Sequence, residues 1–173
     1  MKKKIRITSN EITLRPVLSS DLMKMRSWRN SDWARSFFLN SEIISPEQQE
    51  KWYQSYINKT DDYMFIIELD NIDVGTVALY HVNHDEGSAE FGRLLIAEKE
   101  ARGKSIGEKV LRILSKFAFN DFKLSKITLE VFSDNDKAVY IYQKVGFTVY
   151  DKYFSENREV LKMVLFGGRD GEN

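Results

Sequence analysis

The feature that most constrains this chain is a strand pattern that runs directly into a helix pattern interrupted by glycine. Residues 90–97 indicate a strand, and from Arg102 to Asn120 the apolar side chains recur at helical spacing. Gly103 and Gly107 lie at this junction, where small residues allow a close approach. The first amides of a helix have no partner within it and lie at its positive end. The junction therefore predicts a phosphate site, with an ordinary capped turn as the alternative.

The tripeptide Gly103-Lys104-Ser105 also matches the end of a nucleoside-triphosphatase phosphate loop. In such a loop the first glycine would stand at the position of Glu98, where a carboxylate repels phosphate. The preceding strand also lies in an antiparallel meander and does not open a strand-helix-strand unit. The sequence therefore disfavours a triphosphatase.

The rest of the chain alternates between strand and helix patterns. We expect, in chain order, a strand or hairpin within 4–17, a helix ending near 30, an irregular aromatic segment over 31–44 and a helix over 46–58. Three antiparallel strands follow over 63–69, 72–82 and 90–97. After the helix of 102–120 we expect a strand over 126–132, a helix over 135–145 and a closing strand pair over 147–154 and 160–166. These elements predict an α/β protein with one domain over 1–173 and a frayed tail over 167–173.

The composition excludes several classes of function. The 26 Lys and Arg residues balance 26 Asp and Glu residues, so no global field attracts nucleic acid or anionic lipid. The sequence has no cysteine, which removes disulfides, thiolate metal sites and a cysteine nucleophile. It also has no apolar run long enough to span a bilayer and no signal-peptide pattern. We therefore expect a cytoplasmic protein with no metal, no nucleic-acid partner and no membrane association.

A second group of residues falls on one face of the helix expected over 135–145. Asn135, Ala138 and Tyr142 place an amide, a small gap and a phenol in line. A phenol ordinarily titrates near pH 10, so it is protonated at neutral pH and can give its proton to a stronger base. The alternative is that Tyr142 is a core aromatic residue with a satisfied hydroxyl group.

Together the two segments resemble the signature of the GNAT superfamily of acyl-CoA-dependent N-acyltransferases. Residues 102–107 match its Arg/Gln-x-x-Gly-x-Gly/Ala cradle, and residues 135–147 match its Asn-x-x-Ala-x-x-x-Tyr-x-x-x-Gly-Phe stretch. The resemblance covers roughly Phe65 to Phe166. It implies a mixed, mostly antiparallel, twisted sheet that is splayed in the middle and flanked by about four helices. Acetyl-CoA would lie in the gap between the strand ending near Ile96 and the strand over 127–132.

The resemblance also implies roles for individual residues. The pyrophosphate of the cofactor would lie on the amides of Arg102, Gly103, Lys104, Ser105, Ile106 and Gly107. The pantetheine arm would pair with the backbone of Leu95, Ile96 and Ala97. Asn135 would contact the cofactor, and Tyr142 would protonate the departing CoA thiolate. Ser105 replaces the usual central glycine, which is tolerable if this residue is already helical.

An amine must lose protons to attack a thioester, so a carboxylate is expected near the acetyl group. Glu90 is the candidate, because it resembles the glutamate often found at this strand position in the family. His81 and His84 are alternative bases. A surface glutamate paired with a neighbouring cation is the alternative interpretation of Glu90.

The first two helices are expected to bind the amine that accepts the acetyl group. Their pattern resembles the N-terminal third of sugar-nucleotide N-acetyltransferases such as those of the pseudaminic acid pathway. Aromatic faces stack on sugar or base rings, and arginines make forked bonds to phosphates. We therefore expect a nucleotide-linked amino sugar as the acceptor, bound by Trp28, Arg29, Asn30, Arg35 and Trp52.

Two alternatives to this acceptor assignment are open. A polyamine of the spermidine type would use an acidic, aromatic pocket, for which the sequence offers Glu42, Glu47, Asp85 and Glu86. A catalytically silent acyl-CoA-binding domain is the alternative from a different class, and Tyr142 weakly disfavours it. The protein could also form a homodimer.

Overall fold

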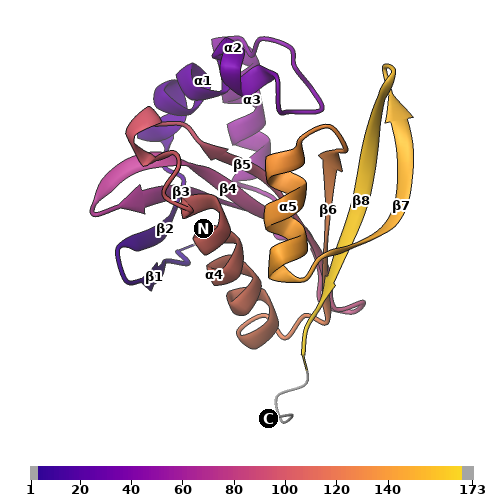
Figure 1. Ribbon diagram of the computed structural model, residues 1–173. Helices are drawn as coiled ribbons and strands as arrows, with labels where there is room; N and C mark the ends of the chain where they lie inside the picture. The colour runs from indigo at the N-terminus through magenta and orange to yellow at the C-terminus, as the bar shows by residue number, and fades with distance from the viewer. Residues whose placement is uncertain (1–3, 169–173) are drawn as a thin grey trace.

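The computed structural model describes residues 4–168, whose strands all join one sheet (Figure 1). The strand order is β1-β2-β3-β4-β5-β6-β8-β7. The strands are β1 (Ile7–Ser9), β2 (Ile12–Pro16), β3 (Tyr63–Leu69), β4 (Ile72–Asn83), β5 (Ser88–Ile96), β6 (Lys126–Phe132), β7 (Thr148–Ser155) and β8 (Arg158–Phe166). Within the described residues the helices are α1 (Leu22–Asn30), α2 (Asp32–Arg35), α3 (Pro46–Tyr56), α4 (Ile106–Asn120) and α5 (Asp136–Val145). Short 3-10 turns cover Ser19–Asp21 and Lys99–Ala101.

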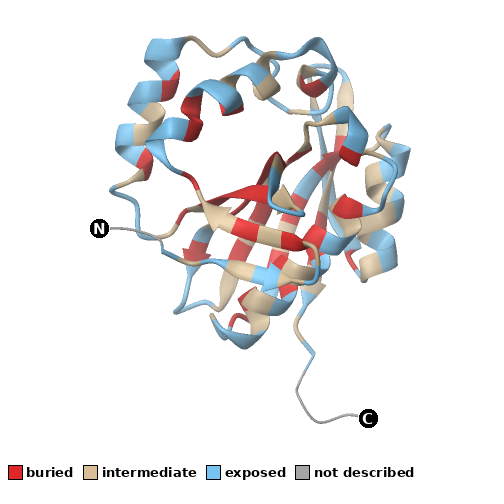
Figure 2. Cartoon of the chain, turned by 90° about the vertical axis from the view of Figure 1, so that its left-hand side faces the viewer, coloured by how far each residue is buried: buried red, intermediate tan, exposed pale blue. Residues whose placement is uncertain are grey.

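The central strands are covered by helices on both faces because their side chains alternate between two apolar clusters. Phe65 and Val77 belong to a cluster with buried residues of α4 and partly buried residues of α5. Ile66 and Ala78, one residue further along each strand, belong to a cluster with residues of α1 and α3. Figure 2 shows the buried residues concentrated along these strands and on the inward side of the helices. The sheet therefore separates a side with α4 and α5 from a side with α1 and α3.

The sheet is splayed between β5 and β6, as expected. These two neighbours run parallel and share only three residue pairs, the last of which joins Glu90 to Thr128. Every other pair of neighbouring strands is antiparallel. Beyond Glu90 the strands separate, and α5 packs at the opening through the ring of Tyr142, 6.3 Å from the ring of Phe91. The splayed, mostly antiparallel sheet confirms the predicted fold.

A β-bulge redirects the end of β5. The register pairs Thr76 with Leu95 and then Ala78 with Gly92, so two residues of β5 lie opposite one of β4. The first of these two, Arg93, has φ 52°. The bulge reverses which side each later residue faces, so that Leu95 lines the side of α1 and α3.

The structure differs from the expected elements in three places. The segment expected to be irregular contains α2, a four-residue helix whose N-terminus is capped by the Ser31 side chain. Residues 99–105 form a 3-10 turn and a loop, so α4 begins at Ile106 and not at Arg102. Ser105 is not helical, so the condition under which its Cβ was expected to be tolerable is not met: it precedes α4 with φ 58°.

The expected frayed tail lies mostly outside the described residues, since residues 169–173 are not among them. Gly167, which follows β8, donates its amide hydrogen to the carbonyl of Ser125 at 2.9 Å. Between residues 4 and 168 no helix has the length and apolar character needed to cross a membrane.

We predict that Gly75→Ala destabilises the fold. A Cβ at Gly75 would lie 1.9 Å from the carbonyl oxygen of Leu95, a backbone atom of β5 that cannot move without disturbing the sheet. Such overpacking should lower the free energy of unfolding by about 1–3 kcal/mol, measured by urea denaturation. Gly168→Ala, where a Cβ meets no atom within 4 Å, is the control. Equal stability of the two variants would contradict the close approach of β4 and β5.

Candidate active site

The N-terminus of α4 offers free amides beside the open end of β5. Ser105 is the N-cap residue, and its side chain makes no capping hydrogen bond. The amides of the first turn therefore have no acceptor in the helix or from the cap. A Cβ at Gly107 would meet only Leu94 Cδ2, at 3.7 Å, and Gly103 has φ 75° with open space around it. An unobstructed turn with free amides fits a phosphate group.

The positive φ of Ser105 explains why glycine is usual at this position of the motif. A left-handed conformation costs a residue with a Cβ about 1 kcal/mol or more relative to glycine. Ser105 therefore adopts a left-handed conformation of the kind that glycine adopts readily.

Arg102 makes hydrogen bonds within the turn, so its amide is not one of the free amides. Its amide donates to the carbonyl of Lys99 at 3.2 Å. Its side chain donates from Nε to the carbonyl of Ile96 at 3.0 Å and from Nη2 to the carbonyl of Ala97 at 2.7 Å. The Ala97 amide is also used, since it donates to Val74 at 2.8 Å. Arg102 thus fixes the end of β5 against the turn, and the amides that remain for a phosphate are those of residues 103–107.

Tyr142 lies on α5 at the splay with a neutral phenol. The helix is capped by Asn135, whose Oδ1 accepts from the amide of Ala138 at 3.3 Å, and it ends at Gly146 with φ 118°. The ring of Tyr142 lies 6.0 Å from the ring of Phe147. Burial raises the pKa of Tyr142 to about 12, and its hydroxyl makes no hydrogen bond within residues 4–168. The phenol is therefore a protonated group that is available to donate.

The Glu90 side chain lies in a small polar cluster on the face of β5 opposite to the one that Tyr142 contacts. Its Oε1 is 3.1 Å from Nδ1 of His81. Burial, and then the charge of Glu90, raises the pKa of Tyr80 to about 12, and Tyr80 also shares a hydrogen bond with Glu90. His84, the other histidine considered as a base, instead packs its ring against Phe122 at 5.4 Å.

The two halves of the site lie on opposite sides of one opening. Glu90 and Phe91 are neighbours on β5, so their side chains point to opposite faces of the sheet. Phe91 contacts Tyr142, and Glu90 is the last residue of β5 that pairs with β6. A proton donor and a carboxylate across one gap can give one proton and take another, which acyl transfer to an amine requires.

A cavity of about 420 Å³ lies on the side of α1 and α3. Its lining includes residues of α1, of the loop before α3, of α3 and of β3 to β5. Arg29 and Trp52 line it. The Arg29 guanidinium lies 3.8 Å over the ring of Phe38 and donates to the carbonyl of Asn40. Its Nη1 is buried and has no hydrogen-bond partner among the described residues.

The other three residues expected to bind the acceptor do not line this cavity. Trp28 donates its indole hydrogen to Glu98 at 2.9 Å, next to the turn before α4. Asn30 and Arg35 bond to backbone atoms within residues 41–44 at 2.7 to 2.8 Å. Asn30 and Arg35 therefore position the loop between α2 and α3, which contributes to the wall of the cavity, whereas Trp28 contacts the turn before α4.

Sequence reasoning missed two arginines of the cavity, Arg26 and Arg93. Arg93 donates to both oxygens of Asp62, at 2.8 and 3.1 Å, and lies 4.5 Å over the ring of Tyr80. It therefore connects the cavity to the Glu90 cluster. No signal in the sequence links Asp62 and Arg93, which are 31 positions apart.

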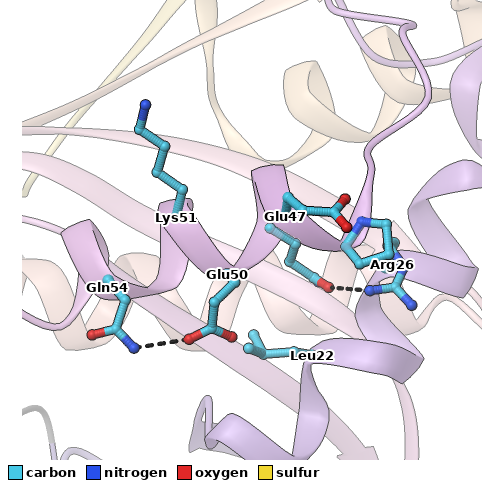
Figure 3. Close-up of a pocket in the computed structure, with 8 residues that line it drawn as sticks. Leu22, Arg26, Glu47, Glu50, Lys51 and Gln54 are labelled. Carbon is cyan, nitrogen blue, oxygen red and sulfur yellow. Dashed lines mark hydrogen bonds between the residues drawn. The ribbon is translucent and has the colours of Figure 1, made fainter.

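A second, more open groove lies between α1 and α3 (Figure 3). Its side chains partly satisfy one another, as in the hydrogen bond from Gln54 to Glu50 at 2.8 Å. Neither the turn before α4 nor the Glu90 cluster contributes to its lining. Among the described residues, no three His, Cys, Asp or Glu side chains are grouped so that they could hold a metal ion.

Comparison with known proteins identifies the class of this protein. Residues 11–148 match the family model described as an acetyltransferase (GNAT) domain. The chain therefore belongs to the GNAT acetyltransferase family and is an acetyl-CoA-dependent N-acetyltransferase.

Its relatives include enzymes with different names. Spermidine N(1)-acetyltransferase of Escherichia coli is 25% identical over 92% of this chain and 88% of its own length. Acetyltransferase PseH of Campylobacter jejuni is 27% identical over 78% of this chain and 81% of its own length. The structure of Vibrio cholerae spermidine N-acetyltransferase with CoA and spermine has a TM-score of 0.83 at 24% identity, covering 91% of this chain and 96% of that one. This structural similarity supports the fold described above for this chain.

Proposed function

We propose that this enzyme acetylates a primary amine on a small molecule that also carries a negatively charged group, with a nucleotide-linked amino sugar as the best-fitting class. The observation that carries this proposal is the unpartnered, buried Nη1 of Arg29 in the 420 Å³ cavity. A buried donor without an acceptor is costly, and a phosphate or carboxylate oxygen would satisfy it with a charge-assisted bond.

The charges of the cavity support an anionic acceptor. Three arginines line it, Arg26, Arg29 and Arg93, against one carboxylate, Glu42. Asp62 neutralises Arg93 through two hydrogen bonds, which leaves two guanidinium groups facing one carboxylate. Burial, and then the nearby charge of Arg35, lowers the pKa of Arg29, yet a guanidinium is charged at neutral pH.

The aromatic lining supports a ring-bearing acceptor. Phe38 and Trp52 both line the cavity, and flat aromatic faces stack on sugar or base rings. The resemblance of the N-terminal third to sugar-nucleotide N-acetyltransferases points to the same class.

A polyamine acceptor is the second candidate, and the relatives named spermidine N(1)-acetyltransferase favour it. Of the four carboxylates that could bind a polycation, only Glu42 lines the cavity. Glu47 lines the open groove between α1 and α3, and Asp85 and Glu86 follow the end of β4. Two guanidinium groups without carboxylate partners would repel a polycation.

The turn before α4 is the proposed site for the cofactor phosphates. The free amides of residues 103–107 would receive the pyrophosphate, and the amide nitrogen of the Asn135 side chain is available to contact the cofactor. Leu95, Ile96 and Ala97 would pair with the pantetheine arm. Arg102 already donates to the carbonyls of Ile96 and Ala97, and a carbonyl has two lone pairs, so each can accept a second bond.

Tyr142 and Glu90 are proposed to handle the protons of the transfer. Glu90 would take a proton from the ammonium group of the acceptor, which frees the lone pair for attack. Tyr142 would give its proton to the departing sulfur of CoA. Desolvation that raises the pKa of the phenol to about 12 also makes a thiolate at the same place more basic, so the phenol remains a competent acid.

We also propose that the enzyme is a homo-oligomer. A Vibrio cholerae relative with 25% identity and a TM-score of 0.75 is described as dodecameric. On this chain, β7 is an edge strand whose apolar side chains Val149, Tyr150, Tyr153 and Phe154 are exposed. Exposed edge strands of this kind are suited to contact a second copy.

The proposal is tested by measuring release of free CoA thiol from acetyl-CoA in the presence of different amines. The panel contains UDP- and TDP-linked amino sugars, spermidine, aminoglycosides and peptides. We expect the largest kcat/KM for a nucleotide-linked amino sugar. Turnover of spermidine with no turnover of any sugar nucleotide would overturn this acceptor class in favour of the polyamine.

The cofactor site predicts the effect of Gly107→Val. The branched side chain would cover the amides of the first turn of α4, and the dissociation constant for CoA, measured by calorimetry, should rise at least about tenfold (~1.4 kcal/mol). Gly107→Ala is the control, since its Cβ would only touch Leu94 Cδ2. Unchanged CoA affinity in the valine variant would place the phosphates elsewhere.

The role of Tyr142 predicts that Tyr142→Phe lowers kcat by about 10²- to 10⁴-fold, because the variant cannot supply the proton. The KM for acetyl-CoA should change little. Tyr140→Phe, which removes an exposed hydroxyl from the same helix, is the matched control. A loss smaller than severalfold in the Tyr142 variant, with chemistry limiting turnover, argues against a general acid at this position.

The role of Arg29 predicts that Arg29→Met raises the KM for a nucleotide-linked amino sugar roughly 10- to 150-fold. This change corresponds to a loss of about 1.5–3 kcal/mol of binding free energy. The KM for acetyl-CoA should change much less. Arg35→Met is the control, because Arg35 bonds to the loop at Ser41 without lining the cavity. If both variants raise the acceptor KM equally, the effect comes from loop order and not from a cation in the cavity.

A further inference from the structure

His81 contacts Glu90 because a second β-bulge turns it there. The register of β4 and β5 pairs Tyr80 with Glu90 and then Asn83 with Ser88, so His81 and Val82 lie opposite the single residue Ala89. His81 has φ 49°. Bulges redirect side chains next to functional sites.

The bulge has a visible effect on which side chains face the carboxylate. Successive strand residues normally point to opposite faces. Here Tyr80 and His81 both interact with Glu90, and Val82 returns to the apolar cluster on the side of α4. A non-glycine residue with positive φ costs about 1–3 kcal/mol and is retained when the surrounding structure requires it. The chain thus uses a strained backbone to bring an imidazole to Glu90.

We propose that His81 carries the proton that Glu90 removes from the acceptor out to water; this rests on the proposed function of Glu90 as the base. A carboxyl group and an imidazole in contact can pass a proton between them, and imidazole is the side chain that commonly serves as a proton shuttle. The Glu90 side chain is 40% exposed, whereas that of His81 is 68% exposed and reaches solvent.

The other groups around this pair do not accept the proton. Tyr80 donates to Glu90, and its ring packs edge-on against the His81 ring at 4.9 Å. Arg93 lies 4.5 Å over the Tyr80 ring and is paired with Asp62. Glu130, whose charge acts on Tyr80, instead accepts a hydrogen bond from the Tyr153 hydroxyl at 3.0 Å. His81 is therefore the group in contact with Glu90 that can accept a proton and release it.

The protons and bonds balance as follows. The ammonium group loses one proton to Glu90, which passes it to Nδ1 of His81 when the imidazole carries its hydrogen on Nε2. The imidazolium releases its Nε2 proton to water, and exchange of one proton with water then restores the Nε2–H tautomer for the next cycle. The new C–N bond then forms and the C–S bond breaks. The second proton lost by the nitrogen replaces the one that Tyr142 gives to sulfur. Each turnover thus consumes an ammonium and acetyl-CoA and yields an amide, free CoA thiol and one proton.

The test variant is His81→Asn. Asparagine tolerates a positive φ and retains a polar group beside Glu90, but it cannot carry a proton. Activity is measured with two amines, a UDP-linked amino sugar and spermidine, at low buffer concentration. For the amine that the wild type acetylates, kcat should fall about tenfold or more, with both KM values within about twofold. Added imidazole should restore kcat in proportion to its concentration.

His84→Asn is the matched control, because His84 is an exposed histidine two residues beyond the bulge and packs on Phe122. It should leave kcat and the imidazole response unchanged. A structural role of His81 would lower kcat without rescue by imidazole, which would overturn the relay. Unchanged kcat in His81→Asn would also overturn it.

Glu90→Gln separates failure of the relay from failure of the proposed function. Loss of activity in Glu90→Gln with full activity in His81→Asn keeps Glu90 as the base and overturns the relay alone. Full activity in Glu90→Gln overturns both. Turnover of neither amine by the wild type contradicts the proposed acceptor classes, and the relay falls with them.

Discussion

The separation of β5 from β6 is the constraint on which the rest of the structure depends. The two strands share three parallel pairs and then diverge after Glu90. A gap in a sheet leaves backbone groups without partners, and such groups must be satisfied by side chains, water or a ligand. The gap also lets an α5 side chain approach from one face while a carboxylate faces the other. Family membership assigns acetyl-CoA as the acyl donor, and the gap explains how one opening can serve both reactants.

Two β-bulges between β4 and β5 adapt the sheet around this opening. Each has a non-glycine residue with positive φ, Arg93 in one and His81 in the other. The first bulge directs Leu95 to the 420 Å³ cavity and places Arg93 between Asp62 and Tyr80. The second brings an imidazole to Glu90. Each of these two bulges thus uses a positive φ to position one polar side chain, a guanidinium in the first and an imidazole in the second.

The helices on the side of the 420 Å³ cavity are connected to the turn before α4. Trp28 of α1 donates to Glu98, and the Arg102 guanidinium lies 3.3 Å over the ring of Trp33 in α2. Arg102 in turn holds the carbonyls at the end of β5. Helices α1 and α2 therefore contact the segment proposed to hold the phosphates, and α1 also lines the cavity proposed for the acceptor. Trp28, which the sequence suggested as a ligand contact, acts here as a link between α1 and the turn before α4.

The sequence by itself determined the elements whose signals are local. Pro46 after Ser45 fixed the start of α3, Asn135 and Gly146 fixed both ends of α5, and the linked motifs around residues 102–107 and 135–147 predicted the splayed sheet and the family. Caps and periodicity depend on neighbouring residues, so they can be recognised without a structure. The roles assigned to Tyr142, Glu90 and the amides of 103–107 stay predictions.

Only the tertiary structure decided that Asn30 and Arg35 hold a loop, that Arg29 has a buried donor without a partner, and that Asp62 neutralises Arg93. These contacts join residues brought together by strand register and helix packing, which depend on the burial of the whole core and not on spacing within one segment.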